Sequence, residues 1–334
     1  MSSDVKKERD SNFELCRLAC MFYIVFYHLI IHVPGLYQEV GWARPLRTIC
    51  HIGVVVFVMI SGYYGIRRSW KGFLKIALTV SFYNLLGLLI AHFCFAQPFD
   101  PKQLLTVVFP ISQGKYWFIT SYVILFLLAP YINTVLDNLG RKEFWIFLAI
   151  MAVLVFYLGG IHQLKAADGR GILAFVLSYG IGRFIRRFYP DGLKGVPMMG
   201  RYPWLAYLLF CTVIYVLVAF APSTVSKGVN FLFFGYNEIG LYIMAVLFFL
   251  AFQGIRIKSR VVNYLAVSVL AIYLLHENSF LNELVYYSTY ERWSAICGNA
   301  WGQLLFHSLF ALGIVITSIA IDQLRRYLFK LCKM

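Results

Sequence analysis

The feature that most restricts the fold of this chain is the recurrence of long apolar segments from one end to the other. A helix needs roughly 20 mostly apolar residues to cross a bilayer core, where it must satisfy its own backbone hydrogen bonds. Ten segments approach that length: 14–34, 49–66, 73–96, 116–137, 143–160, 171–187, 202–221, 236–253, 261–277 and 303–324. The weakest is 171–187, because its apolar part, "GILAFVLSYGIG", is short. We predict an all-α, polytopic integral membrane protein with about ten transmembrane helices.

The distribution of charge predicts the orientation in the membrane. Charged side chains make up only 13% of the 334 residues, against about 25% in soluble domains. The net charge of +15 would suggest nucleic acid for a soluble protein, but the cytoplasmic loops of membrane proteins also collect Lys and Arg. With the N-terminus inside, 22 of the 30 Lys and Arg residues are cytoplasmic and 8 are outside. We therefore predict that both termini are cytoplasmic, with membrane lipids as partners and no nucleic acid.

The connections between the apolar segments are short, which predicts one transmembrane domain over 1–334 with short cytoplasmic tails at 1–12 and 325–334. The longest outer loops are expected at 97–115, 222–235 and 278–302. The seven cysteines form no C-x-x-C pair and lie mostly in apolar segments, so we interpret them as structural. The first apolar run is too long for a signal-peptide core and lacks an A-x-A site, so it is predicted to be retained.

The first apolar segment, "ELCRLACMFYIVFYHLIIH" (14–32), carries ionisable residues at helical spacing. Ser11 and Glu14 have the S-x-x-E spacing of a capping box, which predicts a helix start near residue 12. Arg17 and His28 are eleven residues apart, or three turns plus about 20°, so they project from one face about 16 Å apart. Arg17 is thus expected near the cytoplasmic surface and His28 near mid-membrane. The same stripe carries Glu14, Met21, Ile24, Ile31 and His32.

Each of these residues has a functional and a structural interpretation. Arg17 alone is typical of an interfacial anchor paired with Glu14. His28 fits an interhelical hydrogen bond, but an ionisable group at that depth is costly and usually faces a cavity, which favours function. His32 lies nearer the outer surface, where the structural interpretation is preferred. His28 and His32 have i,i+4 spacing without a third ligand nearby in sequence, so no metal is expected.

Four stretches, in order along the chain, resemble one family. An arginine, ten residues and then a histidine in the first helix is similar to the signature of the acyltransferase 3 family, integral-membrane acyltransferases that modify cell-surface glycans. "GVVVFVMISGYYGI" (53–66) resembles its "F-x-x-I-S-G" run, with Ser61 and Gly62 in place. "FPISQGKYWFITSYVILFLLAPYIN" (109–133) and "AIYLLHEN" (271–278) resemble its "Y-W-F…P-x-x-N" and "I-Y-L-x-H" segments. The family's R-x-x-R at the third helix is replaced by "RRSWKGFLKIAL".

The resemblance implies a membrane-bound O-acyltransferase, with acetyl as the expected group. It would move the acyl group from cytoplasmic acyl-CoA to a sugar hydroxyl of an envelope polysaccharide or a lipid-linked glycan. The expected location is the bacterial cytoplasmic (inner) membrane, with acetyl-CoA or another acyl-CoA as co-substrate and no metal.

The chemistry of such a transfer suggests roles for single residues. A sugar hydroxyl is a poor nucleophile, so a neutral imidazole suits the general base, and we assign the catalytic roles to His28 and Arg17. The phosphates of CoA require cations near the inner surface. These are predicted to be Arg67, Arg68, Lys71 and Lys75, although an ordinary positive-inside loop explains the same cluster.

For the acceptor, aromatic faces with neighbouring hydrogen-bonding groups are typical of sugar sites, so Tyr116, Trp117 and Asn133 are candidates, with packing as the alternative. His276 and Glu277 bind acceptor hydroxyls or orient the reacting groups, unless they are a structural helix-end pair. Ser61 either donates to the developing oxyanion or supports close helix packing at Gly62, and the structural role is favoured.

Two other classes of function remain open. A transporter or flippase of glycan intermediates would also place ionisable residues within the membrane, but inverted repeats and matching broken helices are absent from the sequence pattern. A non-catalytic scaffold in an envelope-assembly complex would leave His28 without a purpose.

Overall fold

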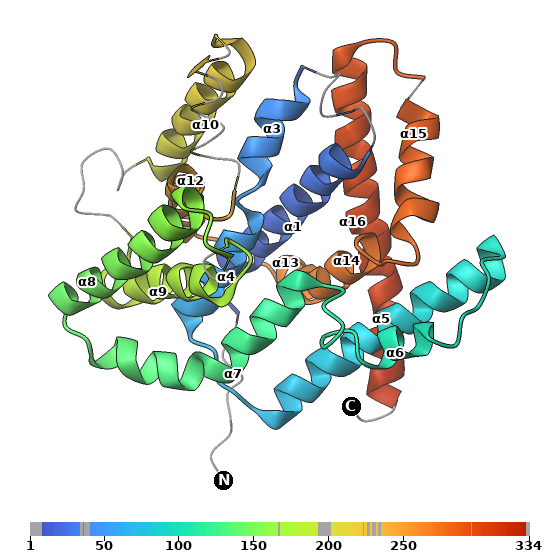
Figure 1. Ribbon diagram of the computed structural model, residues 1–334, viewed down its shortest axis with the longest axis horizontal. Helices are drawn as coiled ribbons and strands as arrows, with labels where there is room; N and C mark the ends of the chain where they lie inside the picture. Colours follow the sequence, from blue (N-terminus) through green and yellow to red (C-terminus); the bar gives the residue numbers. More distant parts are fainter. Residues whose placement is uncertain are drawn as a thin grey trace.

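The computed structural model describes residues 9–33, 36, 41–165, 168–192, 202–222, 224–225, 228, 232, 235–294 and 296–331, and these residues form helices and connections with no strand (Figure 1). The prediction of an all-α fold is confirmed. The helices are α1 (Ser11–His32), α3 (Ala43–Cys50), α4 (Gly53–Tyr64), α5 (Trp70–Phe95), α6 (Gln103–Val108), α7 (Trp117–Asn138), α8 (Arg141–Ala152), η1 (Val153–Ile161), α9 (Ile172–Phe188), α10 (Pro203–Phe220), α12 (Ile239–Gln253), α13 (Arg260–Leu265), η3 (Ala266–Ser268), α14 (Val269–His276), η4 (Asn282–Tyr287), α15 (Ser288–Ser294) and α16 (Ala300–Leu331).

Seven helical stretches of the described chain are long and apolar enough to cross a membrane: 11–32, 43–64, 70–95, 117–138, 141–161, 203–220 and 300–331. Two shorter apolar stretches cover 239–253 and 260–276. Each of the ten predicted ranges overlaps a helix, including 171–187, where α9 runs from Ile172 to Phe188. The last turn of α9 is basic, with Arg186 and Arg187, which shortens its apolar part.

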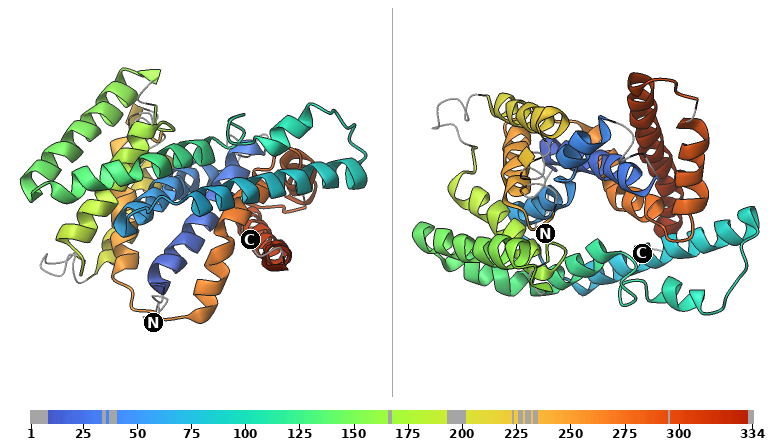
Figure 2. Two further views of the ribbon diagram at one scale, coloured as in Figure 1. Left: turned by 90° about the horizontal axis from the view of Figure 1, so that it is seen from below. Right: turned by 45° about the horizontal axis from the view of Figure 1, so that its top comes forward.

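Helix α1 lies in the middle of the molecule. It contacts α3, α4, α12, α13, α14 and α16, with α10 and α12 on one side of it in Figure 1 and α14 to α16 on the other. The two further views in Figure 2 show the same arrangement, and in the right view α1 lies between α10 and α12 on one side and the α14–α16 region on the other. Because α1 is held by so many neighbours, the side chains along its stripe have fixed positions relative to several other helices.

Two glycines bring α4 and α9 into close contact. A Cβ added at Gly62 would overlap the carbonyl oxygen of Tyr179, and one added at Gly182 would overlap the carbonyl oxygen of Met59. Small residues let helix backbones approach closely in membranes, where dispersion contacts replace the hydrophobic drive between helices. The segment at Ser61 and Gly62 therefore has a role in helix packing, independent of any role in catalysis.

The predicted capping box at the start of α1 is wrong. The helix begins at Ser11, near the predicted position, but its N-cap residue is Asp10 and no side chain caps it. The Ser11 hydroxyl instead accepts from the backbone N–H of Ser259 over 2.9 Å, which links α1 to the start of α13. Glu14 pairs with Arg17 at 2.9 Å and with Arg9 at 3.6 Å, so its carboxylate is engaged by cations rather than by the helix end.

The connection predicted as the outer loop 278–302 contains η4 and α15, which fold Tyr287 back toward the end of α14. The loop predicted at 97–115 likewise contains α6. At the C-terminus, α16 continues to Leu331, so residues 325–331 of the predicted tail are helical. Residues 1–8 and 332–334 of the predicted tails, and most of the predicted loop at 222–235, lie outside the described residues.

Candidate active site

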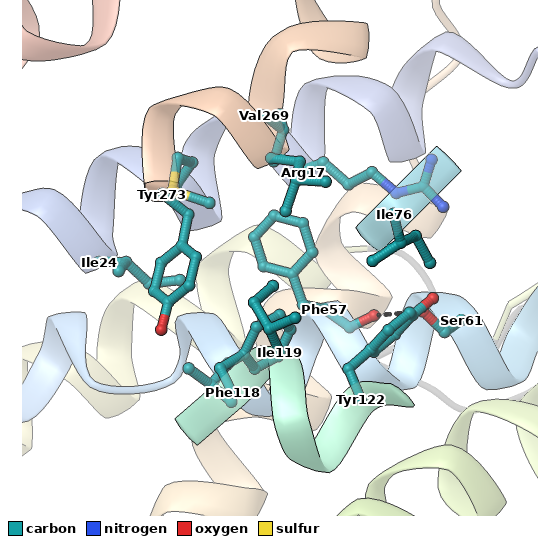
Figure 3. Close-up of a pocket in the computed structure, with 13 residues that line it drawn as sticks. Arg17, Ile24, Phe57, Ser61, Ile76, Phe118, Ile119, Tyr122, Val269 and Tyr273 are labelled. Atoms are coloured by element: carbon teal, nitrogen blue, oxygen red, sulfur yellow. Dashed lines mark hydrogen bonds between the residues drawn. The ribbon is translucent and has the colours of Figure 1, made fainter. Parts of the chain in front are cut away.

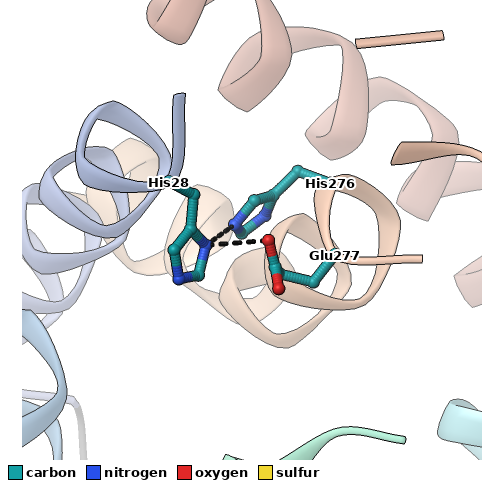
Figure 4. Close-up of side chains that lie close together, drawn as sticks. All are labelled: His28, His276 and Glu277. Atoms are coloured by element: carbon teal, nitrogen blue, oxygen red, sulfur yellow. Dashed lines mark hydrogen bonds and ion pairs between the residues drawn. The ribbon is translucent and has the colours of Figure 1, made fainter. Parts of the chain in front are cut away.

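Three ionisable side chains from two helices meet beside the middle of the molecule. His28 comes from α1, and His276 and Glu277 come from the end of α14 (Figure 4). His28 Nδ1 lies 2.9 Å from His276 Nε2 and 3.0 Å from Glu277 Oε1. The two stretches that carry them are 248 residues apart in sequence, so this cluster is a product of the fold.

The hydrogen bonds assign the protonation of both rings. His276 Nδ1 lies 2.7 Å from the carbonyl oxygen of Ile272, which can only accept, so Nδ1 carries the proton. In the neutral His276 ring Nε2 then has a lone pair, and it accepts the proton of His28 Nδ1. The remaining nitrogen of His28, Nε2, is thereby the one with the free lone pair. It points away from both partners in Figure 4 and has no hydrogen-bond partner among the described residues.

Glu277 is the charged member of the cluster. Its Oε1 lies 3.0 Å from His28 Nδ1 and accepts from the Tyr287 hydroxyl at 3.3 Å, and His32 Nε2 lies 3.9 Å away. The Glu277 side chain is only 20% exposed, so its negative charge is stabilised mainly by these neighbouring groups and little by water. A carboxylate in this position stabilises an imidazolium at His28 when that ring accepts a second proton.

A cavity of about 280 Å³ runs along the N-terminal half of α1. Arg17, Ser61 and Tyr122 lie at one end of it, and Ile24 and Tyr273 lie at the other (Figure 3). Its remaining walls are apolar: Met21, Val54, Phe57, Ile76, Phe118, Ile119, Val269 and Leu270. The predicted stripe of α1 is thus the cavity wall, since Arg17, Met21 and Ile24 all line it.

The cavity ends one helical turn before the cluster. Ile24 precedes His28 by four residues, and Tyr273 precedes Glu277 by four, which corresponds to about 6 Å along each helix. The Tyr273 and His276 rings lie 5.9 Å apart, so Tyr273 separates the cavity from the cluster. A ligand in the cavity therefore points its far end at His28 without touching it in this conformation.

The cluster contains three potential metal ligands, whereas the i,i+4 spacing of His28 and His32 in the sequence offered only two. The ligand atoms of His28, His276 and Glu277 all lie within 4.8 Å of one another. Two nitrogens bound to one tetrahedral zinc would lie about 3.3 Å apart. The observed 2.9 Å between His28 Nδ1 and His276 Nε2 is a hydrogen-bond distance, and the cluster fits a hydrogen-bond relay better than a metal site.

The predicted cations of the third helix are dispersed. Arg67 and Lys71 are exposed, and Arg68 donates to the Leu127 carbonyl at 3.4 Å with its guanidinium 5.5 Å above the Tyr131 ring. Lys75 lines a cavity that is separate from the apolar cavity and lies next to it. All four side chains are exposed, and Lys75 lies beside the apolar cavity.

Of the predicted acceptor residues, the structure brings only His276 and Glu277 to His28. Tyr116 is buried and donates to Asn84 Oδ1 and the Leu274 carbonyl, both at 3.2 Å. Asn133 donates to the Ile66 carbonyl at 3.0 Å and accepts from the Tyr179 hydroxyl at 2.6 Å. These bonds hold α7 against its neighbours.

Trp117 and Ser61 have different surroundings. The Trp117 ring lies 5.2 Å from that of Tyr236, with the Arg170 guanidinium 5.6 Å above it. Ser61 lines the cavity, but its hydroxyl donates to the Phe57 carbonyl at 3.1 Å, and it lies at the Arg17 end (Figure 3). That position is at the end of the cavity opposite Tyr273, away from the His28 cluster, and favours the structural role.

Sequence reasoning missed Tyr287, Tyr273 and Tyr122, which contact the cluster or line the cavity. Tyrosine is abundant here, with 23 in the chain, so residue type alone gives no signal. Tyr273, however, stands one turn before Glu277 in a segment already singled out for its motif, and helical spacing would have placed it on the same face.

Comparison with known proteins gives one match. The sequence model of a protein family described as an acyltransferase domain matches residues 10–322, nearly the whole chain. No curated protein and no solved structure matched.

Proposed function

The chain belongs to the acyltransferase 3 family, which makes it a membrane acyltransferase, and we propose that it is an O-acyltransferase, with acetyl as the expected group. The donor is acyl-CoA from the cytoplasm, and the acceptor is a sugar hydroxyl of an envelope polysaccharide or of a lipid-linked glycan. The proposal includes ten membrane spans, cytoplasmic termini and a place in the bacterial inner membrane, as the charge distribution favours.

The observation that carries the proposal is the free lone pair on His28 Nε2. A hydrogen bond to His276 Nε2 at 2.9 Å holds the Nδ1 proton of the same ring, so the tautomer is fixed, and Glu277 Oε1 lies 3.0 Å from that nitrogen. A general base needs an available nitrogen and a partner that stabilises its protonated form. His28 has both, with Glu277 as that partner.

The transfer then proceeds with balanced proton movement. His28 Nε2 removes the proton of the acceptor hydroxyl as its oxygen attacks the thioester carbonyl carbon. The carbon–oxygen bond forms and a tetrahedral oxyanion results. When it collapses, the carbon–sulfur bond breaks and the imidazolium returns the proton to the departing CoA thiolate. General-base assistance of this kind contributes on the order of 10²–10⁴-fold.

The two substrates approach His28 from opposite ends of the stripe of α1. The acyl arm of the donor occupies the apolar cavity, which begins at Arg17 near the start of α1. The acceptor approaches on the other side, where His32 has 42% of its side chain exposed and Glu277 has 20%. Arg17, paired with Glu14, acts at the donor end of the cavity.

The experiment uses membranes that contain the protein, labelled acetyl-CoA and a lipid-linked glycan. Wild-type protein should transfer label, and His28→Ala should lose at least about 100-fold at equal protein level. His92→Ala is the matched control, because that exposed histidine at the end of α5 bonds only to the Gln97 carbonyl. Equal transfer by wild type and His28→Ala would remove His28 from the mechanism. A transporter would move glycan without consuming the thioester, and that result would refute the proposal.

A further inference from the structure

A second cavity, of about 580 Å³, lies between α5, the α13–α14 segment and the last turns of α16. Five cationic side chains line it: Arg9, Lys75, Arg325, Arg326 and Lys330. They come from the start of the described chain, from the start of α5 and from the end of α16, so distant parts of the sequence concentrate positive charge here.

This basic cavity adjoins the apolar donor cavity. Ile76 of α5 and Leu270 of α14 line both. A second basic cavity of about 470 Å³, which includes Arg256 and Lys258, shares no lining residue with the apolar one. A ligand that spans a charged site and an apolar site can therefore use only the first of the two.

The charge in the basic cavity is only partly balanced. Arg325 donates to Asp322 at 2.6 Å, and Arg9 lies 3.6 Å from Glu14, which Arg17 also contacts. Among the described residues, no carboxylate lies within ion-pair distance of Lys75 or Lys330.

Arg326 completes the set of cations. Its guanidinium lies 4.4 Å above the Tyr264 ring and donates to Gln323, which is neutral. Five cations with two carboxylates leave a surplus of positive charge, and such a cluster binds anions that carry several charges.

The distance to His28 matches the length of the donor. The arm between the diphosphate and the sulfur of CoA has about twelve bonds, like four extended residues, and spans about 14 Å. The axial rise from Arg17, at the inner end of the apolar cavity, to His28 is about 16 Å. A diphosphate held beside Arg17 thus brings the thioester to the Ile24 and Tyr273 end of the apolar cavity, about one helical turn before His28.

We propose that this basic cavity binds the phosphate groups of the acyl-CoA donor, with Lys75, Arg326 and Lys330 as direct ligands. The inference rests on the proposed function, because it names where the donor of that transfer is held. It assigns the nucleotide site mainly to the end of α16, in place of the Arg67, Arg68 and Lys71 cluster.

The test measures equilibrium binding of CoA and of pantetheine to the purified full-length protein in neutral detergent. Arg326→Ala/Lys330→Ala should weaken CoA binding about 10- to 100-fold and leave pantetheine binding unchanged, because pantetheine lacks the phosphates. The matched control, Arg256→Ala/Lys258→Ala, removes the same charge from the other basic cavity and should change CoA binding less than about threefold.

Three outcomes of the binding measurement overturn the assignment. Equal weakening by both double variants, unchanged CoA binding in Arg326→Ala/Lys330→Ala, or no CoA binding by wild type would do so. Displacement of CoA by phosphatidylglycerol at stoichiometric levels would mark a lipid-headgroup site instead. Acyl transfer that persists with unchanged CoA affinity in the variant would refute this site and leave the proposed function standing. CoA binding at this site without transfer would refute the function alone.

Discussion

Replacement of Glu277 by Gln removes one negative charge from the cluster and preserves the shape of the side chain and an acceptor oxygen. The tautomer of His28 should survive, because His276 Nε2 still accepts the Nδ1 proton at 2.9 Å. The variant therefore isolates a single effect: the stabilisation of the imidazolium that His28 becomes when it takes the acceptor's proton.

The magnitude follows from the geometry. Two unit charges 3.0 Å apart interact by about 5 kcal/mol at an effective dielectric constant of about 20. The Glu277 side chain is 20% exposed and the Gln oxygen still accepts a hydrogen bond, so about 3–4 kcal/mol of that is expected to be lost. At about 1.4 kcal/mol for each tenfold, kcat should fall roughly 10²- to 10³-fold.

The assay is the initial rate of acetyl transfer at saturating acetyl-CoA, with protein level matched by immunoblot and CoA affinity measured separately. We expect a lower kcat with unchanged CoA affinity, since Glu277 lines neither donor cavity. His276→Gln is the companion variant, and its loss should be smaller, near tenfold, because the charge remains. A loss under about threefold for Glu277→Gln would refute the relay.

The remaining predictions concern packing, a neighbouring hydroxyl and metal. Tyr287→Phe removes a donor 3.3 Å from Glu277 and should lower kcat about two- to fivefold, whereas a 100-fold loss would mean that the hydroxyl acts on substrate. Gly62→Ala should lower the unfolding temperature in detergent by several degrees, because its Cβ would overlap the Tyr179 carbonyl oxygen. Gly313→Ala, with open space at its Cβ, should not lower it, and equal unfolding temperatures would contradict the close α4–α9 contact. Treatment with phenanthroline should leave transfer intact, and a loss that zinc restores would show that the relay residues hold a metal.

Helix periodicity predicted the part of the site that lies on one helix. The stripe of α1 depends only on 3.6 residues per turn, and Arg17, Met21 and Ile24 do line one cavity. The i,i+3 pairing of Glu14 with Arg17 follows from the same spacing, and the two side chains meet at 2.9 Å. Contacts of this kind need no knowledge of how helices are arranged.

The rest depends on which helices pack together, and a single sequence does not contain that information. The motif at 271–278 marked His276 and Glu277 as candidates, but only the packing of α14 on α1 puts them beside His28. For the cations of the third helix, the sequence analysis instead grouped residues that the fold does not bring to one site. Charge alone does not distinguish Arg67 on the surface from Lys75 in a cavity wall, because both fit a positive-inside loop.

The direction of the hydrogen bonds in the relay also affects whether protons can leak through the protein from one side of the membrane to the other. The chain of donors ends at the carbonyl oxygen of Ile272, which accepts a hydrogen bond but does not pass a proton onward. A proton therefore does not pass onward through His276, and the base exchanges its proton with the substrates on the Nε2 side. Proteoliposomes that contain this chain should hold a pH gradient as tightly as empty vesicles, even though the two proposed substrates arrive from opposite compartments.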